Sequence, residues 1–191
     1  METRRTVALS APAGVLVAAT GIGIAALLTP LDPLTQAISE LGAPEAPYSA
    51  VMNISFIVGG VVSLPFGALL ASEARNVYER AGAFFVSVAF LALTALGVFP
   101  IGRSYHIPAA ITLYASFTVA LWVHGTGEAL AGETRRGLAT VWLGNFNVIV
   151  WASWAFWRVY APGLALPEAL GVSMFVVWIL ATTRRFYNSS A

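Results

Sequence analysis

The chain has 191 residues, of which 58% are hydrophobic and only 10% are charged, and its formal net charge is +1. This composition excludes an ordinary soluble domain, and no cluster of basic residues lies beside aromatics as nucleic-acid binding would need. Lysine and cysteine are both absent, which excludes Schiff-base chemistry, thiolate nucleophiles and thiolate metal ligands.

Six apolar stretches follow one another along the chain, and each is long enough to cross a bilayer, whose core takes about 20 helical residues. We expect spans near residues 6–29, 49–72, 81–100, 107–131, 137–160 and 164–183. The predicted fold class is all-α: a polytopic membrane protein, a bundle of six transmembrane helices with a short outer interfacial helix. Residues 1–191 then form a single transmembrane domain with no separate soluble module.

The first span begins like a signal peptide, because Arg4 and Arg5 precede a long apolar run. The run is longer than a typical signal core, and no small-residue cleavage site follows it. We therefore expect a signal anchor that is not cleaved.

The arginines predict the orientation of the bundle. Two of the ten, Arg103 and Arg158, fall in the connections on one side, and the other eight fall at the chain ends and in the connections on the opposite side: Arg4, Arg5, Arg75, Arg80, Arg135, Arg136, Arg184 and Arg185. Basic residues concentrate on the cytoplasmic side of membrane proteins. We therefore expect a multi-pass protein of the cell membrane with both termini in the cytoplasm.

The connection over residues 30–48 predicts the interfacial helix, near residues 33–41. Asp32 and Pro33 are typical of a helix start, and Gly42 is typical of a left-handed helix end. The residues between them place an apolar face opposite a polar one, as in a helix lying on the outer membrane surface.

The same connection carries a family resemblance. Residues 38–44 read Ile-Ser-Glu-Leu-Gly-Ala-Pro; Asn53 follows early in the second span, Gly-Val-Phe-Pro occupies residues 97–100, and His106 opens the fourth span. This order resembles the prokaryotic membrane family of domain of unknown function 998 and is more distantly similar to the Frag1/DRAM/Sfk1-type six-span proteins. The resemblance implies the six-span fold and links the chain to membrane organisation, lipid-linked regulation and autophagy, without implying a reaction.

Polar groups inside a membrane are costly and need partners or a wet cavity. A candidate outer pocket, roofed by the loop helix, comprises Ser39, Glu40, Asn53, Arg103, His106 and Glu168. These groups suit a lipid headgroup, a proton relay or, with less support, a divalent metal. The structural alternative is an ion pair between Glu40 and Arg103, with His106 capping the fourth span or bonding a loop carbonyl.

A candidate inner polar cluster comprises His124, Glu128, Asn145 and Asn147. Residues four apart share a helix face, and the fourth and fifth spans are antiparallel neighbours, so these side chains fall at similar depths. Interhelical hydrogen bonding accounts for the cluster. A proton or ion path entering at Glu128 is the alternative.

The second span carries Gly59, Ser63 and Gly67 at four-residue spacing. A stripe of small residues lets a neighbouring helix approach closely. We expect this stripe to be a packing surface.

The leading hypothesis is a six-span protein without catalytic activity that binds membrane lipids or a membrane partner through the outer pocket. One alternative is an accessory subunit of a larger membrane complex, with other membrane protein subunits as partners. Another is a membrane-embedded lipid hydrolase or transferase using His106 with Glu40 or Glu168, and transport ranks behind these. The sequence predicts no cofactor, no metal site and no nucleic-acid partner, and the catalytic residues of the hydrolase alternative stay unknown.

Overall fold

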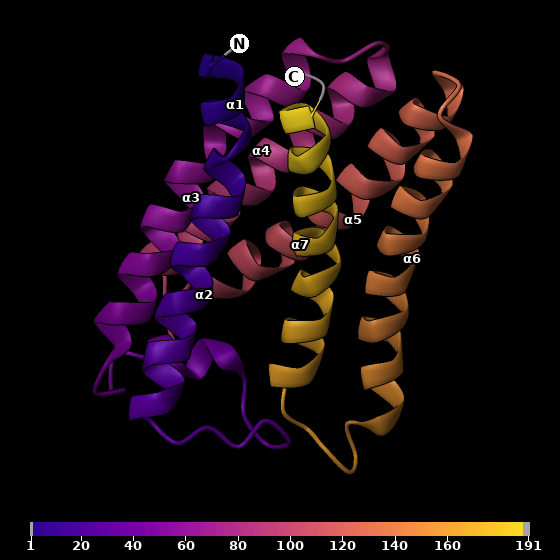
Figure 1. The fold of residues 1–191 in the computed structure, drawn as a ribbon. Coiled ribbons are helices and arrows are strands. Elements are labelled where there is room, and N and C mark those ends of the chain that lie inside the picture. The colour runs from indigo at the N-terminus through magenta and orange to yellow at the C-terminus, as the bar shows by residue number, and fades with distance from the viewer. Residues whose placement is uncertain (1, 189–191) are drawn as a thin grey trace.

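The computed structural model describes residues 2–188 as a bundle of helices (Figure 1). In chain order the helices are α1 (Glu2–Ala8), α2 (Ser10–Leu28), α3 (Ser49–Ser72), α4 (Val77–Val98), α5 (His106–Leu130), α6 (Thr134–Trp157) and α7 (Ala165–Asn188). α1 and α2 together form the first span, so six helical segments run back and forth. Each segment packs mainly on its neighbours in sequence, and α7 returns to contact α1 and α2.

The connections gather at two ends of the bundle (Figure 1). One end holds the start of α1, the end of α7 and the short connections at residues 73–76 and 131–133. The other holds residues 29–48, 99–105 and 158–164. We call these the inner and outer ends, after the orientation that the arginines predict.

The helix bounds agree with the predicted spans to within a few residues, and α3 matches its span at both ends. α4 begins at Val77 rather than residue 81 because Asn76 caps it: the Asn76 side chain accepts a hydrogen bond from the Glu79 backbone N–H at 3.0 Å. A search for apolar stretches misses this charged first turn.

Five helical segments of residues 2–188 are long and apolar enough to cross a membrane: Glu2–Leu28, Ser49–Ser72, Val77–Val98, His106–Leu130 and Ala165–Asn188. α6 is not among them, although it is as long as α3. Its two asparagines and four tryptophans lower its mean hydropathy. The bundle is therefore that of a polytopic helical membrane protein, while the crossing by α6 stays a prediction.

The interfacial helix predicted near residues 33–41 forms only in part, because residues 33–37 are not helical and the helix that follows is a short 3₁₀ helix. Asp32 does cap a turn, because its carboxylate accepts hydrogen bonds from the Leu34 backbone N–H at 3.0 Å and the Thr35 hydroxyl at 2.8 Å. These bonds hold the pKa of the Asp32 carboxyl below its usual range. The chain then becomes extended at Ala37, and only a short 3₁₀ helix, η1 (Ile38–Gly42), follows. Within residues 2–188 Gly42 is not among the positive-φ glycines.

Residues 33–37 of the loop are not helical because its backbone groups bind partners outside a helix. The Ala37 N–H donates to the Glu40 carboxylate at 2.9 Å, and the Ile38 N–H donates to the Glu168 carboxylate at 2.7 Å. Two backbone hydrogen bonds connect the loop to the start of α7. The Gly163 N–H donates to the Leu34 carbonyl, and the Ala165 N–H donates to the Gln36 carbonyl. Since each N–H is satisfied there, the loop gains nothing from forming a helix.

The small-residue stripe of α3 serves two neighbours rather than one. A Cβ at Gly59 would lie 3.2 Å from the Cβ of Ala18 in α2, whereas a Cβ at Gly67 would lie 3.3 Å from the Cβ of Ser87 in α4. Ser63 lies with Gly59, against Gly14 of α2. The close approach occurs as predicted, and it is shared between α2 and α4.

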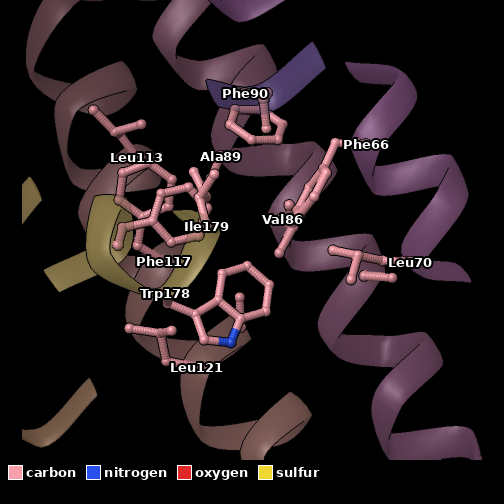
Figure 2. Packing of buried hydrophobic residues seen from close by; sticks show 14 of the residues in the cluster. Phe66, Leu70, Val86, Ala89, Phe90, Leu113, Phe117, Leu121, Trp178 and Ile179 are labelled. Carbon is pink, nitrogen blue, oxygen red and sulfur yellow. The ribbon is translucent and has the colours of Figure 1, made fainter. Parts of the chain in front are cut away.

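Aromatic side chains fill the middle of the bundle, between α3, α4, α5 and α7 (Figure 2). Phe117 and Phe175 stack with their ring centroids 3.7 Å apart, and Trp178 stacks with Phe175 at 5.6 Å. Phe66 meets Trp178 edge to face at 6.3 Å. This aromatic core separates the outer half of the bundle from the inner half.

Candidate functional site

A cavity of about 150 Å³ lies in the outer half of the bundle. Helices α2, α3, α4, α5 and α7 form its walls, and η1 covers part of it. Most of the lining is apolar, including Val15, Ala18, Phe56, Leu93, Ala110, Leu113 and Val172. Phe117 and Phe175 of the aromatic core also line the cavity.

Four of the six predicted outer residues line this cavity: Ser39, Asn53, His106 and Glu168. They come from η1 and from the outer parts of α3, α5 and α7. The cavity therefore has an apolar body and a polar end, which is the usual arrangement of a site for a partly hydrophobic ligand.

Each of these side chains is positioned by the protein backbone. His106 Nδ1 lies 3.0 Å from the Phe99 carbonyl oxygen, and Asn53 Nδ2 donates to the Gly42 carbonyl at 3.0 Å. A Cβ at residue 42 would lie 2.5 Å from Asn53 Oδ1, so a larger residue there would displace the Asn53 amide. The Ile-Ser-Glu-Leu-Gly motif is thus fixed directly to the second span.

Glu168 ties the loop to α7. Its carboxylate accepts the Ile38 N–H at 2.7 Å, and the Ser39 amide and hydroxyl lie beside the same group. The Tyr114 hydroxyl donates to the Glu168 backbone carbonyl at 3.3 Å. Glu168 therefore holds η1 over the cavity while lining it.

Glu40 and Arg103, the other two predicted outer residues, do not line the cavity. Glu40 turns back on its own loop, accepting hydrogen bonds from the Ala37 N–H and from Gln36 Nε2 at 3.2 Å. Arg103 is exposed in the connection before α5. Among residues 2–188 the structure forms no ion pair between Glu40 and Arg103, so this part of the structural alternative is wrong. Its other part is confirmed, because His106 Nδ1 bonds the carbonyl oxygen of Phe99 in the connection before α5.

The exposure of the lining residues indicates that the cavity opens between α2 and α7. Ala19 of α2 is exposed on the outside of the bundle and also lines the cavity, and Ile22, Val172 and Val176 beside it are half-buried. α2 packs mainly on α3 and α7 mainly on α6, with few contacts between α2 and α7. The mouth therefore faces the side of the bundle, where lipid surrounds a membrane protein.

The inner polar cluster divides into separate groups. His124 and Glu128 do lie together, with His124 Nε2 3.7 Å from Glu128 Oε1. Asn145 instead accepts a hydrogen bond from Trp122 Nε1 at 2.9 Å, and Asn147 donates to the Thr118 hydroxyl at 2.7 Å. Helical rise predicts that these side chains lie at similar depths, but the two asparagines do not contact Glu128. They lie further along the face between α5 and α6.

Glu128 is the centre of an ion network that the sequence did not predict. Although Glu128 is only 1% exposed, its carboxylate accepts hydrogen bonds from Arg136 at 2.8 Å, from Arg185 at 2.7 Å and from the Thr140 hydroxyl at 2.9 Å. Two of the arginines that predicted the orientation are thus also structural partners. Arg185 lies 57 positions from Glu128, so no local pattern could reveal the pair.

A second cavity of about 210 Å³ lies at the inner end beside this network. Ion pairs line it, including Arg4 with Glu73 at 3.0 Å and Arg75 with Glu79. The glutamates stand close to arginines in the sequence, which is a signal that could have found this cluster. His124 also lines the cavity, and its Nε2 has no hydrogen-bond partner among the described residues.

Within residues 2–188, no group of three or more His, Asp or Glu side chains could hold a metal ion.

The helices and their apolar faces define the class of this chain: it is a polytopic helical protein embedded in a membrane. A family model described as "Protein of unknown function (DUF998)" matches residues 12–185. The chain belongs to this family, as the motifs around Glu40 and His106 predicted. No curated protein and no solved structure matches the chain. The distant resemblance to the Frag1/DRAM/Sfk1-type proteins stays a prediction.

Proposed function

We propose that this protein binds the hydrocarbon chain of a membrane amphiphile in the outer cavity, without catalysing a reaction. The observation that carries the proposal is the shape of the lining: an apolar body, a polar end at His106 and Glu168, and a mouth between α2 and α7. An amphiphile diffusing in the outer leaflet meets that mouth from the side, with its polar end already near the membrane surface.

The size of the cavity favours a single chain. A closed apolar cavity of about 150 Å³ accepts a group of roughly the size of benzene, and the outer cavity has about this volume. A short length of one hydrocarbon chain fits, and the remainder of the ligand extends through the mouth into the bilayer. Both chains of a phospholipid do not fit inside together.

The apolar wall alone gives little affinity, because lipid tails are as apolar as the side chains that replace them. Selection therefore depends on packing in the cavity and on hydrogen bonds at its polar end. A hydrogen bond contributes about 0.5–1.5 kcal/mol net, so two bonds at the polar end give a preference of roughly fivefold to a hundredfold.

Filling the cavity tests the proposal. Ala110 lines the cavity, whereas Ala115, five residues further along α5, is exposed on the bundle surface. Ala110→Phe should remove the amphiphile that co-purifies with the unmodified chain, as measured by native mass spectrometry, and Ala115→Phe should retain it. Equal retention in both folded variants contradicts the proposal.

The polar end has a separate test. Alanine at Asn53, His106 or Glu168 should change the amount or kind of retained lipid while the protein still inserts into the membrane. If all three variants retain the same lipids as the unmodified chain, these residues do not select the ligand.

Two other readings remain open as proposals. Since His106 and Glu168 line the same cavity, a lipid hydrolase or transferase is one; loss of amphiphile turnover in His106→Ala supports it, and absence of turnover in the unmodified chain removes it. An accessory subunit is the other, because large apolar side chains such as Trp142 and Phe156 of α6 are exposed. Purification in a gentle detergent that yields only the lone chain counts against that reading.

For location, we propose the cell membrane with both termini in the cytoplasm. The start of α1 and the end of α7 lie at one end of the bundle (Figure 1), the end that carries eight of the ten arginines. A reporter fused after the last residue should be active only in the cytoplasm. Activity on the opposite side of the membrane contradicts this orientation.

A further inference from the structure

The hydrogen-bond donors at the polar end of the outer cavity already bind protein carbonyls. His106 Nδ1 faces the Phe99 carbonyl oxygen at 3.0 Å. Because a carbonyl oxygen only accepts, this contact places a proton on Nδ1, and in the tautomer protonated at Nδ1 alone Nε2 is an acceptor. The ring itself lines the cavity.

Asn53 and Tyr114 repeat this arrangement. One of the two N–H groups of the Asn53 amide donates to the Gly42 carbonyl, which orients the amide and leaves Oδ1 as an acceptor. The Tyr114 hydroxyl donates to the Glu168 carbonyl. Three donors from α3 and α5 are thus directed at backbone oxygens rather than at a ligand.

The acceptors stay open. Neither His106 Nε2 nor Asn53 Oδ1 has a hydrogen-bond partner among residues 2–188, and neither is among the fully buried polar atoms of that range. The carboxyl group of Glu168 lies at the same end of the cavity, but it already accepts the Ile38 N–H and is bonded by the Ser39 amide and hydroxyl. The acceptors that still need a donor are therefore His106 Nε2 and Asn53 Oδ1.

No positive charge faces this end. The chain has no lysine, and among the described residues no arginine lines the outer cavity. Arg103 is exposed outside it. Placing a phosphate or carboxylate headgroup there removes its water without supplying a cation, and an uncompensated charge is costly to bury.

We infer that the outer cavity selects single-chain amphiphiles whose polar end donates hydrogen bonds, such as a long-chain alcohol or a long-chain amine, against anionic amphiphiles of the same chain length. The inference rests on the proposed function, because it concerns the ligand of the same cavity. The hydroxyl or ammonium hydrogen of the ligand meets His106 Nε2 and the neighbouring acceptors, while its chain lies along the apolar wall.

A matched set of ligands tests the inference on the full chain in nanodiscs of zwitterionic phospholipid. The probes are hexadecanol, hexadecylamine, hexadecyl methyl ether and palmitate, each added at the same mole fraction, with occupancy read by native mass spectrometry. The alcohol or the amine should exceed the ether and palmitate by about tenfold, as expected from one or two hydrogen bonds.

The outcomes separate this inference from the proposed function. If palmitate or the ether reaches the same occupancy as hexadecanol and hexadecylamine, the donor preference is overturned, while the proposed binding of a hydrocarbon chain stands. If none of the four probes binds, the proposed function fails, and the inference fails with it. If only the amine exceeds the ether and palmitate in occupancy, the preference is assigned to the carboxylate of Glu168. If the alcohol exceeds them as much as the amine does, the preference is assigned to the neutral acceptors.

A variant connects the preference to a named atom. His106→Phe keeps a ring in place of the imidazole and removes Nε2, so the preference for hexadecanol over its ether should fall several-fold. Tyr105→Phe is the matched control, because Tyr105 is exposed and does not line the cavity. An unchanged preference in folded His106→Phe overturns the assignment to Nε2; should that variant not fold, the ligand series on the unmodified chain still decides.

Discussion

Glu128 has the highest density of charged contacts in the described chain. One carboxylate joins Arg136 of α6 to Arg185 of α7, and Thr140 completes its hydrogen bonds. A buried ion pair is weak evidence of net stabilisation, yet removing one partner is costly because the others lose their compensation. The arginines here are about one-third exposed, so water recovers part of that loss.

Glu128→Gln should therefore destabilise the protein by about 1–3 kcal/mol, the range for hydrogen bonds to charged groups. Unfolding by SDS titration, followed by tryptophan fluorescence, measures the change. Glu133→Gln is the control: Glu133 is half-exposed and pairs at 3.4 Å and 3.8 Å, so its loss should cost less than about 1 kcal/mol. Equal effects in the two variants contradict a structural role for the buried network.

The sequence predicted the residues that α5 contributes to this site, but not the partners that come from α6 and α7. Four-residue spacing placed His124 and Glu128 on one helix face, and the structure brings them to 3.7 Å. The partners from α6 and α7 depend on how helices far apart in sequence pack. The positions of those arginines were already accounted for by the orientation of the bundle, so nothing in the sequence required them to have a second role as partners of Glu128.

At the scale of elements, α4 and α5 approach each other closely beside the inner cavity. A Cβ at Gly82 would lie 2.5 Å from the His124 Cβ and 2.9 Å from its Cα. Backbone atoms of α5 cannot move aside as a flexible side chain can. Gly82 is therefore the residue that lets α4 hold the His124 ring beside the Glu79 carbonyl, at 3.3 Å.

Gly82→Ala should push α4 from α5 and destabilise the protein by about 1–3 kcal/mol, as overpacking does. Gly23→Ala is the control, since nothing lies within 4 Å of the Cβ position there; it should be neutral or stabilising by up to about 1 kcal/mol, from helix propensity. SDS titration compares the two. A neutral Gly82→Ala would show that the helices are further apart than described.

The loop over residues 30–48 shows where local patterns fail. Asp32, Pro33 and Gly42 have the residue types of a helix start and end, and Asp32 does cap a turn. The helix does not form over residues 33–37 because Glu168 and the backbone at residues 163–165 bind the loop. These partners are about 130 positions away, and local spacing carries no information about them.

At the scale of the whole molecule, the assignment of the two cavities to opposite sides of the membrane requires that α6 crosses it. The chain has no native cysteine, so single cysteines can be labelled without background. Thr134→Cys and Tyr160→Cys mark the two ends of α6, and both positions are exposed. A membrane-impermeant maleimide should label Tyr160→Cys in intact cells and Thr134→Cys only after lysis. Labelling of both in intact cells contradicts the crossing.

The six-helix layout could be predicted because the length of each apolar stretch can be read from the sequence, without knowing which helix it packs against. The outer cavity could be predicted only in part. Depth along each helix brought Ser39, Asn53, His106 and Glu168 to one end, whereas the direction of each side chain decided that Glu40 and Arg103 stay outside. The apolar walls come from five helices, and the opening between α2 and α7 depends on packing that no single helix encodes.

An experimental density map of the protein purified with native lipid tests the central claim most directly. An elongated density should enter between α2 and α7 beside Ala19, run along Val172 and Phe175, and end within hydrogen-bond distance of His106. A cavity that holds only water, or helices α2 and α7 closed against each other with no space between them, contradicts the account.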